Sequence, residues 1–174
     1  DNVQGNAALD GSLMMGSILT NIGGIAGNYL SLDGSFDYVD VSNQLMSGSD
    51  FAGAWSASGW FRADRAPGAG ERFMVFETAD EYTISVGLRD GSSPELTNIQ
   101  FFTRTSTVTN LNISVEVPDT DIAGQWIHVT ITYERSGADS TLRAYVNGVE
   151  EGSLNFSGGD NLPVEATGGF HIGT

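Results

Sequence analysis

Three aspartates stand within eight residues of the stretch NYLSLDGSFDYVDV, which covers residues 28–41. Asp33 and Asp37 flank the turn signal LDGS, so their carboxylates could lie within reach of each other. Carboxylate oxygens are ligands that Ca²⁺ prefers, and a calcium site needs about six to eight oxygens. The alternative is an ordinary corner between two strands, in which Asp33 forms the turn and Asp37 faces solvent. Asp40 shares a face with Tyr38 and is expected to face solvent.

Aromatic and basic side chains form a second candidate site, of the kind that binds sugars. At a strand's period of two residues, Trp60 and Arg62 share one face, and Trp126 and His128 share one face of another strand. If these faces line an open groove, Trp60, Arg62 and His128 would offer a glycan an aromatic platform beside polar groups. Large aromatics at strand spacing more often pack in a core, so packing is the alternative for both tryptophans.

The chain lacks the residue patterns of the common catalytic sites. The two histidines, His128 and His171, have no second histidine at metal-ligand spacing, and there is no Gly-x-Ser-x-Gly elbow, Walker loop or dinucleotide fingerprint. Cysteine and lysine are absent, which excludes disulfides, thiolate metal sites, cysteine nucleophiles and Schiff bases. The segment VEVPDTD comes nearest to a strand with paired carboxylates, but Pro118 interrupts it. We therefore expect no enzymatic activity.

The excess of acidic residues limits the kinds of molecule that the chain can bind. The 174-residue chain has 22 acidic and 7 basic residues and a formal net charge of −15, and every basic residue is arginine. Such a surface repels phosphate backbones, which argues against nucleic acid as a partner, and it favours divalent cations. An Asp-rich chain without lysine also suggests salty surroundings, marine or halophilic. No apolar run approaches the ~18–20 residues of a membrane span, so we expect no membrane insertion.

Most of the chain after residue 28 alternates polar and apolar residues at the period of a β-strand. Gly- and Asp-rich turn signals separate these runs, and Asn147-Gly148 is the pair that a type I′ hairpin turn prefers. Residues 1–28 are predicted to be an irregular lead-in with one short strand over 12–19, and PDTDIAGQ to make one helical turn. The sequence thus predicts an all-β, antiparallel two-sheet β-sandwich (jelly roll) that forms a single domain over 1–174. The strands are expected over 29–35, 37–42, 54–63, 72–79, 81–89, 98–106, 111–118, 125–135, 141–154 (a hairpin) and 168–174.

Two blocks of this pattern resemble a known family. LSLDGSFDYVDV and GQWIHVTITYE…LRAYVNGV, with the spacing between them, are similar to the laminin-G-like (LamG) jelly rolls of the concanavalin A-like lectin/glucanase superfamily, over Tyr29–Thr174. The resemblance implies a two-sheet sandwich, a fold that hosts unrelated functions. It also implies a structural Ca²⁺ near the LDG corner, held here by Asp33 and the Gly34 carbonyl with Asp37 as a helper. Glucanases of the superfamily resemble one another in a Glu-x-Asp-x-(x)-Glu strand, and this chain has no such motif.

Domains of this family usually have one strand before the lead-in and one after the HIG segment, and both are missing from this sequence. Three explanations compete: the sequence is part of a longer protein, it is a proteolytic piece, or a neighbouring subunit supplies a strand to an open sheet edge.

The resemblance and the residues together favour a non-catalytic recognition or adhesion domain, secreted or at the surface of a bacterium or archaeon. Its partner would be a glycan or a surface protein, with stabilisation by Ca²⁺. Two alternatives stay open. One is a structural subunit of a filament, pilus or surface layer, which would pair with copies of itself through sheet edges. The other is a relative of the glycoside hydrolases.

Overall fold

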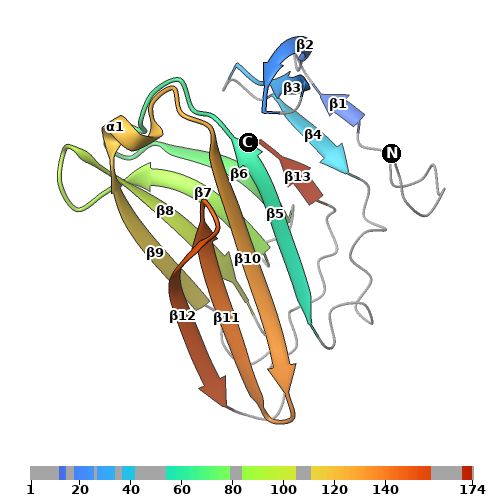
Figure 1. The fold of residues 1–174 in the computed structure, drawn as a ribbon, viewed down its shortest axis with the longest axis vertical. Coiled ribbons are helices and arrows are strands. Elements are labelled where there is room, and N and C mark those ends of the chain that lie inside the picture. The colour runs from blue at the N-terminus through green and yellow to red at the C-terminus, as the bar shows by residue number, and fades with distance from the viewer. Residues whose placement is uncertain are drawn as a thin grey trace.

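The structure is a computed structural model, and it describes residues 12–14, 18–25, 27–33, 37–41, 54–78, 84–104, 111–157 and 170–173. Within these ranges the chain forms two antiparallel sheets that share one core, with a small hairpin beside them (Figure 1). This confirms the predicted all-β sandwich.

The larger sheet has seven strands among the described residues, in the order β1-β4-β13-β6-β7-β8-β9. Each neighbouring pair is antiparallel. The strands are β1 (Ser12–Met14), β4 (Tyr38–Val41), β13 (Phe170–Ile172), β6 (Arg72–Thr78), β7 (Ile84–Asp90), β8 (Leu96–Thr103) and β9 (Leu111–Pro118).

The smaller sheet has four strands, in the order β12-β11-β10-β5. They are β5 (Trp55–Phe61), β10 (Ile127–Ser136), β11 (Asp139–Val146) and β12 (Val149–Ser157). The one-turn helix α1 (Asp119–Ile122) follows β9 and carries the chain to β10 in the other sheet, as PDTDIAGQ predicted.

The core lies between the two sheets, because each central strand sends alternate side chains inward. In β10, Val129 and Ile131 are fully buried, whereas His128 and Thr130 are partly exposed. Burial of each such aliphatic side chain contributes about 1.5–3 kcal/mol. The opposite, outward faces of the sheets are therefore the places where polar side chains can meet a partner. Other members of the core are Phe76, Ile84, Val86, Leu88, Ile99, Phe101, Leu111, Ile113, Val115, Tyr133 and Leu142.

The hairpin between β11 and β12 turns at the predicted pair. Asn147 and Gly148 have φ angles of 51° and 83°, the left-handed conformation that both central positions of a type I′ turn require. Asparagine and glycine adopt this conformation at little cost, so the prediction is confirmed.

The lead-in is more regular than predicted. β1 pairs with β4 at the edge of the large sheet, and β2 (Ile18–Gly24) pairs with β3 (Gly27–Ser31) as a hairpin. The prediction of one short strand over 12–19 in an otherwise irregular lead-in is thus wrong for the described residues. Apolar patterning is weak there and glycines interrupt it, so these strands depend on their pairing partners rather than on local propensity.

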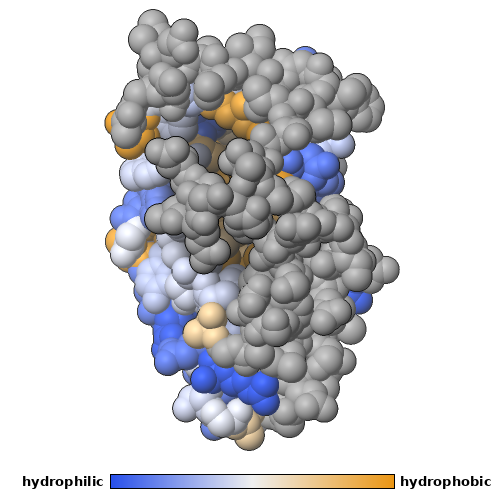
Figure 2. Space-filling model, turned by 90° about the vertical axis from the view of Figure 1, so that its right-hand side faces the viewer, coloured by the Kyte–Doolittle hydropathy of each residue, from blue (hydrophilic) through white to orange (hydrophobic). Residues whose placement is uncertain are grey.

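Polar residues dominate the described surface that is visible from the right-hand side of Figure 1, with isolated hydrophobic residues among them (Figure 2). Four large hydrophobic side chains stand out as exposed in the described ranges: Ile25, Trp60, Val149 and Ile172. In the same ranges there is no helix with the length and apolar character needed to span a membrane.

Candidate functional site

The outward face of the seven-stranded sheet carries a row of side chains that crosses five strands. Cross-strand partners in an antiparallel sheet share a face, so the register places Asp40, His171, Glu77, Ser85 and Phe102 in one line, on β4, β13, β6, β7 and β8. Their neighbours along each strand are mostly buried or packed against the core, so the row faces outward. We call it the outer row.

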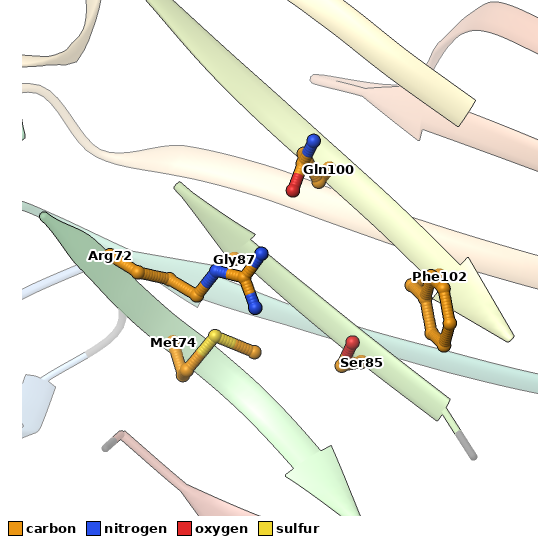
Figure 3. A pocket seen from close by; sticks show the side chains of 6 residues that line it. All are labelled: Arg72, Met74, Ser85, Gly87, Gln100 and Phe102. Atoms are coloured by element: carbon orange, nitrogen blue, oxygen red, sulfur yellow. The ribbon is translucent and has the colours of Figure 1, made fainter. Parts of the chain in front are cut away.

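A shallow pocket lies at one end of the outer row, between β6, β7 and β8 (Figure 3). Its volume of about 80 Å³ is well below the ~300–1,000 Å³ of a cleft that encloses a small molecule. It can therefore seat one part of a ligand whose remainder lies along the open sheet face. Two residues from each strand line it: Arg72, Met74, Ser85, Gly87, Gln100 and Phe102.

Gly87 lies in the floor of the pocket and leaves room there for Met74. A Cβ at Gly87 would lie 2.8 Å from the Met74 sulfur and 3.1 Å from the Phe73 carbonyl oxygen, so the missing side chain leaves the space that Met74 fills. Ser85 is only 5% exposed although it faces outward, and the Arg72 side chain extends toward Gly87 (Figure 3). The lining thus combines hydrogen-bonding groups with apolar surface.

An ion pair holds the loop that leads into Arg72. Arg65 donates two hydrogen bonds to the Glu71 carboxylate, one of them 2.9 Å long, and the Gly68 N–H donates a third of 2.7 Å. These donors, Arg65 first, lower the pKa of Glu71 to about 2. The Arg65 guanidinium also lies 5.0 Å from the centre of the Phe73 ring, a cation–π distance. Together these contacts fix the start of β6.

At the other end of the outer row, His171 lies among acidic and aromatic side chains. Its Nε2 is 3.9 Å from Asp40 Oδ1, and its ring centre is 4.7 Å from that of Tyr38. Glu77 is its partner on the opposite side. Imidazole and phenol groups can both donate and accept hydrogen bonds, whereas carboxylates accept them. This end of the row therefore suits a ligand with several hydroxyl groups.

Asn98 extends the same face beyond Gln100 on β8. Its Oδ1 is buried and accepts no hydrogen bond from the described residues. The carboxylate of its partner Glu116 is occupied, since it accepts hydrogen bonds from the Ser92 N–H (2.7 Å) and Oγ (3.0 Å). An unsatisfied buried acceptor costs about 1–3 kcal/mol, so a donor from water or a ligand is expected at Asn98.

The residues predicted to bind a ligand belong to the other sheet or, for Arg62, to the residue that follows its strand β5. Trp60 and His128 are cross-strand partners on β5 and β10, and their ring centres are 4.9 Å apart. Both face outward on the four-stranded sheet, where Trp60 is 50% exposed, so Trp60 is not a core residue. Arg62 is exposed directly after the end of β5, with its Nη2 3.8 Å from Asp64 Oδ1. The structure thus brings Trp60 and His128 together, away from the pocket.

The residues predicted to bind calcium lie between β3 and β4. Asp33 is exposed, whereas Asp37 is buried and its Oδ2 accepts a hydrogen bond of 3.1 Å from the Asp33 N–H. Gly34 is outside the described residues. In the described ranges no group of three or more acidic, His or Cys side chains could hold a metal ion. Because Ca²⁺ needs about six to eight oxygens, the described donors by themselves do not fit it.

Sequence reasoning missed the outer row. Alternation indicates that Asp40, Glu77 and Ser85 face away from the core, but it does not say which strands are neighbours. β13, from the far end of the sequence, inserts between β4 and β6 and brings His171 into the row. No local pattern carries that information.

Comparisons with known proteins identify the fold. A laminin G family model, described as "Concanavalin A-like lectin/glucanases superfamily", matches residues 33–174. No curated protein matches the sequence. Among solved structures, an endo-1,3-beta-glucanase from Streptomyces sioyaensis is similar at 12% identity and a TM-score of 0.51, over 91% of this chain and 63% of the glucanase.

Two further structures are similar at lower TM-scores. A heptameric SAP-like pentraxin from Limulus polyphemus has 16% identity and a TM-score of 0.41, over 70% of this chain and 52% of the pentraxin. An alginate lyase from Pseudomonas aeruginosa has 15% identity and a TM-score of 0.42, over 79% of this chain and 70% of the lyase. The chain thus spans less than two thirds of the pentraxin and of the glucanase, and at these identities the likeness concerns the fold alone. Since the family match extends over residues 33–174, the chain belongs to the concanavalin A-like lectin/glucanases superfamily.

Proposed function

We propose that the chain is a non-catalytic recognition domain that binds a glycan on the outward face of its seven-stranded sheet. The observation that carries this proposal is the pocket between β6, β7 and β8, where guanidinium, hydroxyl and amide groups lie beside a thioether and a phenyl ring. Sugars present hydroxyl groups at their edges and C–H groups on their ring faces, so a sugar site needs both kinds of surface.

The outer row supports a ligand longer than one sugar. From Phe102 on β8 to Asp40 on β4 it crosses four strand spacings, or about 19 Å. An oligosaccharide seated in the pocket would pass over Glu77 and His171 and could donate hydroxyl hydrogens to the carboxylates of the row.

We propose an extracellular setting, secreted or at a cell surface, within a larger protein or assembly. Laminin-G-like domains are typically extracellular, and the family match supports this setting. The net charge of −15 is consistent with it, because strong charge of one sign keeps a protein soluble and separate from its copies.

Affinity gel electrophoresis tests the proposal, with laminarin, xylan, mannan and alginate as probes. At least one polysaccharide should retard the wild-type chain. Gln100→Ala and Phe102→Ala should each weaken that binding by about 10-fold, because one lost contact of about 1.4 kcal/mol changes affinity tenfold. Thr120→Ala, at an exposed position of α1, is the control and should bind as the wild type does. Equal retardation of all four proteins would remove the pocket from the proposal.

Glycoside hydrolysis is a second candidate that one observation favours. Asp40 and Glu77 flank His171 on one face, and two strand spacings separate their backbones by about 10 Å. The carboxyl groups of inverting glycosidases are about 6.5–9.5 Å apart. An assay for new reducing ends with the same polysaccharides decides between the two candidates. Activity that disappears in both Asp40→Asn and Glu77→Gln would establish the hydrolase and overturn the non-catalytic proposal.

A further inference from the structure

We infer that the outward face of the four-stranded sheet carries a second ligand site, centred on Trp60, for the ring of a neutral sugar. The inference goes beyond the proposed function because it gives the domain two binding faces. It rests on the proposed function only for the class of ligand, a glycan.

The exposure of Trp60 separates it from the other two tryptophans. Trp55 stacks on Tyr133 with ring centres 5.7 Å apart, and Trp126 packs edge-on against Tyr29 at 5.9 Å. Both indoles are therefore packed against another aromatic ring and are only partly exposed. Trp60 is 50% exposed on a flat sheet face, which leaves much of its indole to contact a ligand. An aromatic face carries partial negative charge and attracts the C–H groups of a sugar ring.

The platform around Trp60 is held in place by its neighbours. The His128 ring lies against it at an angle of 47°. The backbone N–H of His128 donates a hydrogen bond to Asn147 Oδ1 (2.9 Å), and the backbone N–H of Asn147 donates one to the His128 carbonyl oxygen (2.8 Å). The left-handed turn residue thereby fixes the strand beneath the two rings. A site built in advance in this way loses less entropy when a ligand binds.

Hydroxyl groups lie directly beside the platform. The next cross-strand row on the same face consists of Ser58, Thr130 and Tyr145, on β5, β10 and β11. Each hydroxyl can donate and accept a hydrogen bond, as the hydroxyls of a sugar do. The face thus offers an aromatic surface for the ring and a line of hydroxyls for its edge.

The charges of this face favour a neutral ligand. Arg143 lies between two carboxylates, 3.4 Å from Glu134 and 3.8 Å from Glu150, so its charge is balanced within the sheet. The net charge of −15 repels polyanions, and for the same reason it opposes docking of a second copy of the chain at Trp60.

Two sites on opposite faces of one sandwich cannot hold the same sugar unit. Each domain would therefore bind two polysaccharide chains, or two distant parts of one chain, and would cross-link a neutral polysaccharide. Cross-linking of this kind requires both sites, whereas simple binding requires one.

Acrylamide quenching of tryptophan fluorescence reports on Trp60, because Trp55 and Trp126 are engaged in packing. With laminarin, xylan and mannan as probes, a bound polysaccharide should reduce quenching in the wild type and in Gln100→Ala. In Trp60→Phe quenching should be weak throughout and should not respond to the probe. Turbidity should show cross-linking by the wild type and by the control variant, while Trp60→Ala and Gln100→Ala each bind without it. Thr132→Ala, two rows away on the same face, is the matched control, and melting curves confirm that the variants fold.

The outcomes separate this inference from the proposed function. If a probe binds and Gln100→Ala weakens that binding, but the quenching of Trp60 stays unchanged and Trp60→Ala still cross-links, the second site is wrong and the proposed pocket stands. If Trp60→Ala abolishes all binding and Gln100→Ala has no effect, the second site stands and the proposed pocket is wrong. Binding of no probe overturns both, and a concentration-dependent dimer that Trp60→Ala abolishes overturns the sugar ligand at Trp60.

Discussion

The sequence predicts the Asp37 carboxylate as a calcium ligand, whereas in the structure this carboxylate accepts a hydrogen bond from the backbone. It is 5% exposed, and its Oδ2 accepts a hydrogen bond from the Asp33 N–H, four residues earlier in the chain. The residue type predicts an oxygen ligand for a cation at this corner, whereas the structure describes a hydrogen bond from the backbone to the same side chain. The partner was not predictable, because a hydrogen bond from the backbone and a metal contact can use the same carboxylate oxygen.

Removal of the Asp37 carboxylate should therefore destabilise the fold without any metal. In buffer with EDTA, Asp37→Ala should lower the free energy of unfolding by about 1.5–3 kcal/mol, the range for a buried hydrogen bond to a charged group. Asp33→Ala, at an exposed side chain, should change it by less than about 0.5 kcal/mol. Urea unfolding measures both. If Asp37→Ala matters only when Ca²⁺ is present and EDTA removes the difference, the carboxylate serves a cation and not the turn.

Glu71 should titrate far below an ordinary glutamate. Its pKa is lowered to about 2 by the hydrogen bonds from Arg65 and Gly68, against about 4.3 in an unfolded chain. A lowered pKa stabilises the fold above the unfolded value, and the effect is lost as the pH falls through the folded value. The difference in Tm between the wild type and Glu71→Gln should thus be present at pH 6 and shrink between about pH 5 and 2. A carboxyl NMR titration of Glu71 with a midpoint near 4 would contradict this.

At the scale of elements, the period of two residues predicted the strands well wherever one face is buried. β10 is the clearest case, since its apolar alternates Val129 and Ile131 are buried and its polar alternates are not. The β2–β3 hairpin was missed, although part of β3 lies in the strand expected over 29–35, because the apolar residues of β2 do not alternate and glycines stand at the turn between the two strands. The pairing of the strands could not be predicted either, since the neighbours of β13 in the sheet lie far from it in sequence. The outer row depends on that pairing, and for that reason the sequence did not predict it.

The β11–β12 hairpin allows the two roles of Asn147 to be separated. The backbone of Asn147 is left-handed, a conformation that suits asparagine or glycine. Its side-chain Oδ1 also accepts a hydrogen bond from the backbone N–H of His128. Asn147→Gly keeps the backbone preference and loses one hydrogen bond, so it should cost about 0.5–1.5 kcal/mol. Asn147→Ala should cost about 1 kcal/mol more, because alanine at positive φ is strained. Thermal unfolding measures both variants. Equal losses would mean that the turn conformation contributes nothing beyond the side-chain contact.

For the whole molecule, the division into an apolar interior and two polar outward faces leaves both faces available, one with the pocket and one with Trp60. The net charge of −15 is also a property of the whole molecule, because it is the sum over all charged residues. The described pairs are spread over separate loops and strands, from Arg65–Glu71 to Arg143–Glu134. With 22 acidic and 7 basic residues, acidic side chains outnumber basic ones about three to one. Mutual repulsion among them opposes the compact state.

Salt should therefore stabilise this protein. Between about 0.02 and 0.5 M NaCl the Debye length falls from about 20 Å to about 4 Å, which screens repulsion between exposed carboxylates. A gain of at least about 1 kcal/mol should raise Tm by about 2–4 °C for a chain of this size. Screening depends on ionic strength, so NaCl and KCl should act alike, and CaCl₂ at equal ionic strength should add nothing unless a specific site exists. A Tm that stays constant or falls with NaCl would show that the net charge does not limit stability. An extra rise with CaCl₂ that Asp33→Ala abolishes would place a calcium site at the β3–β4 corner, with ligands beyond the described residues.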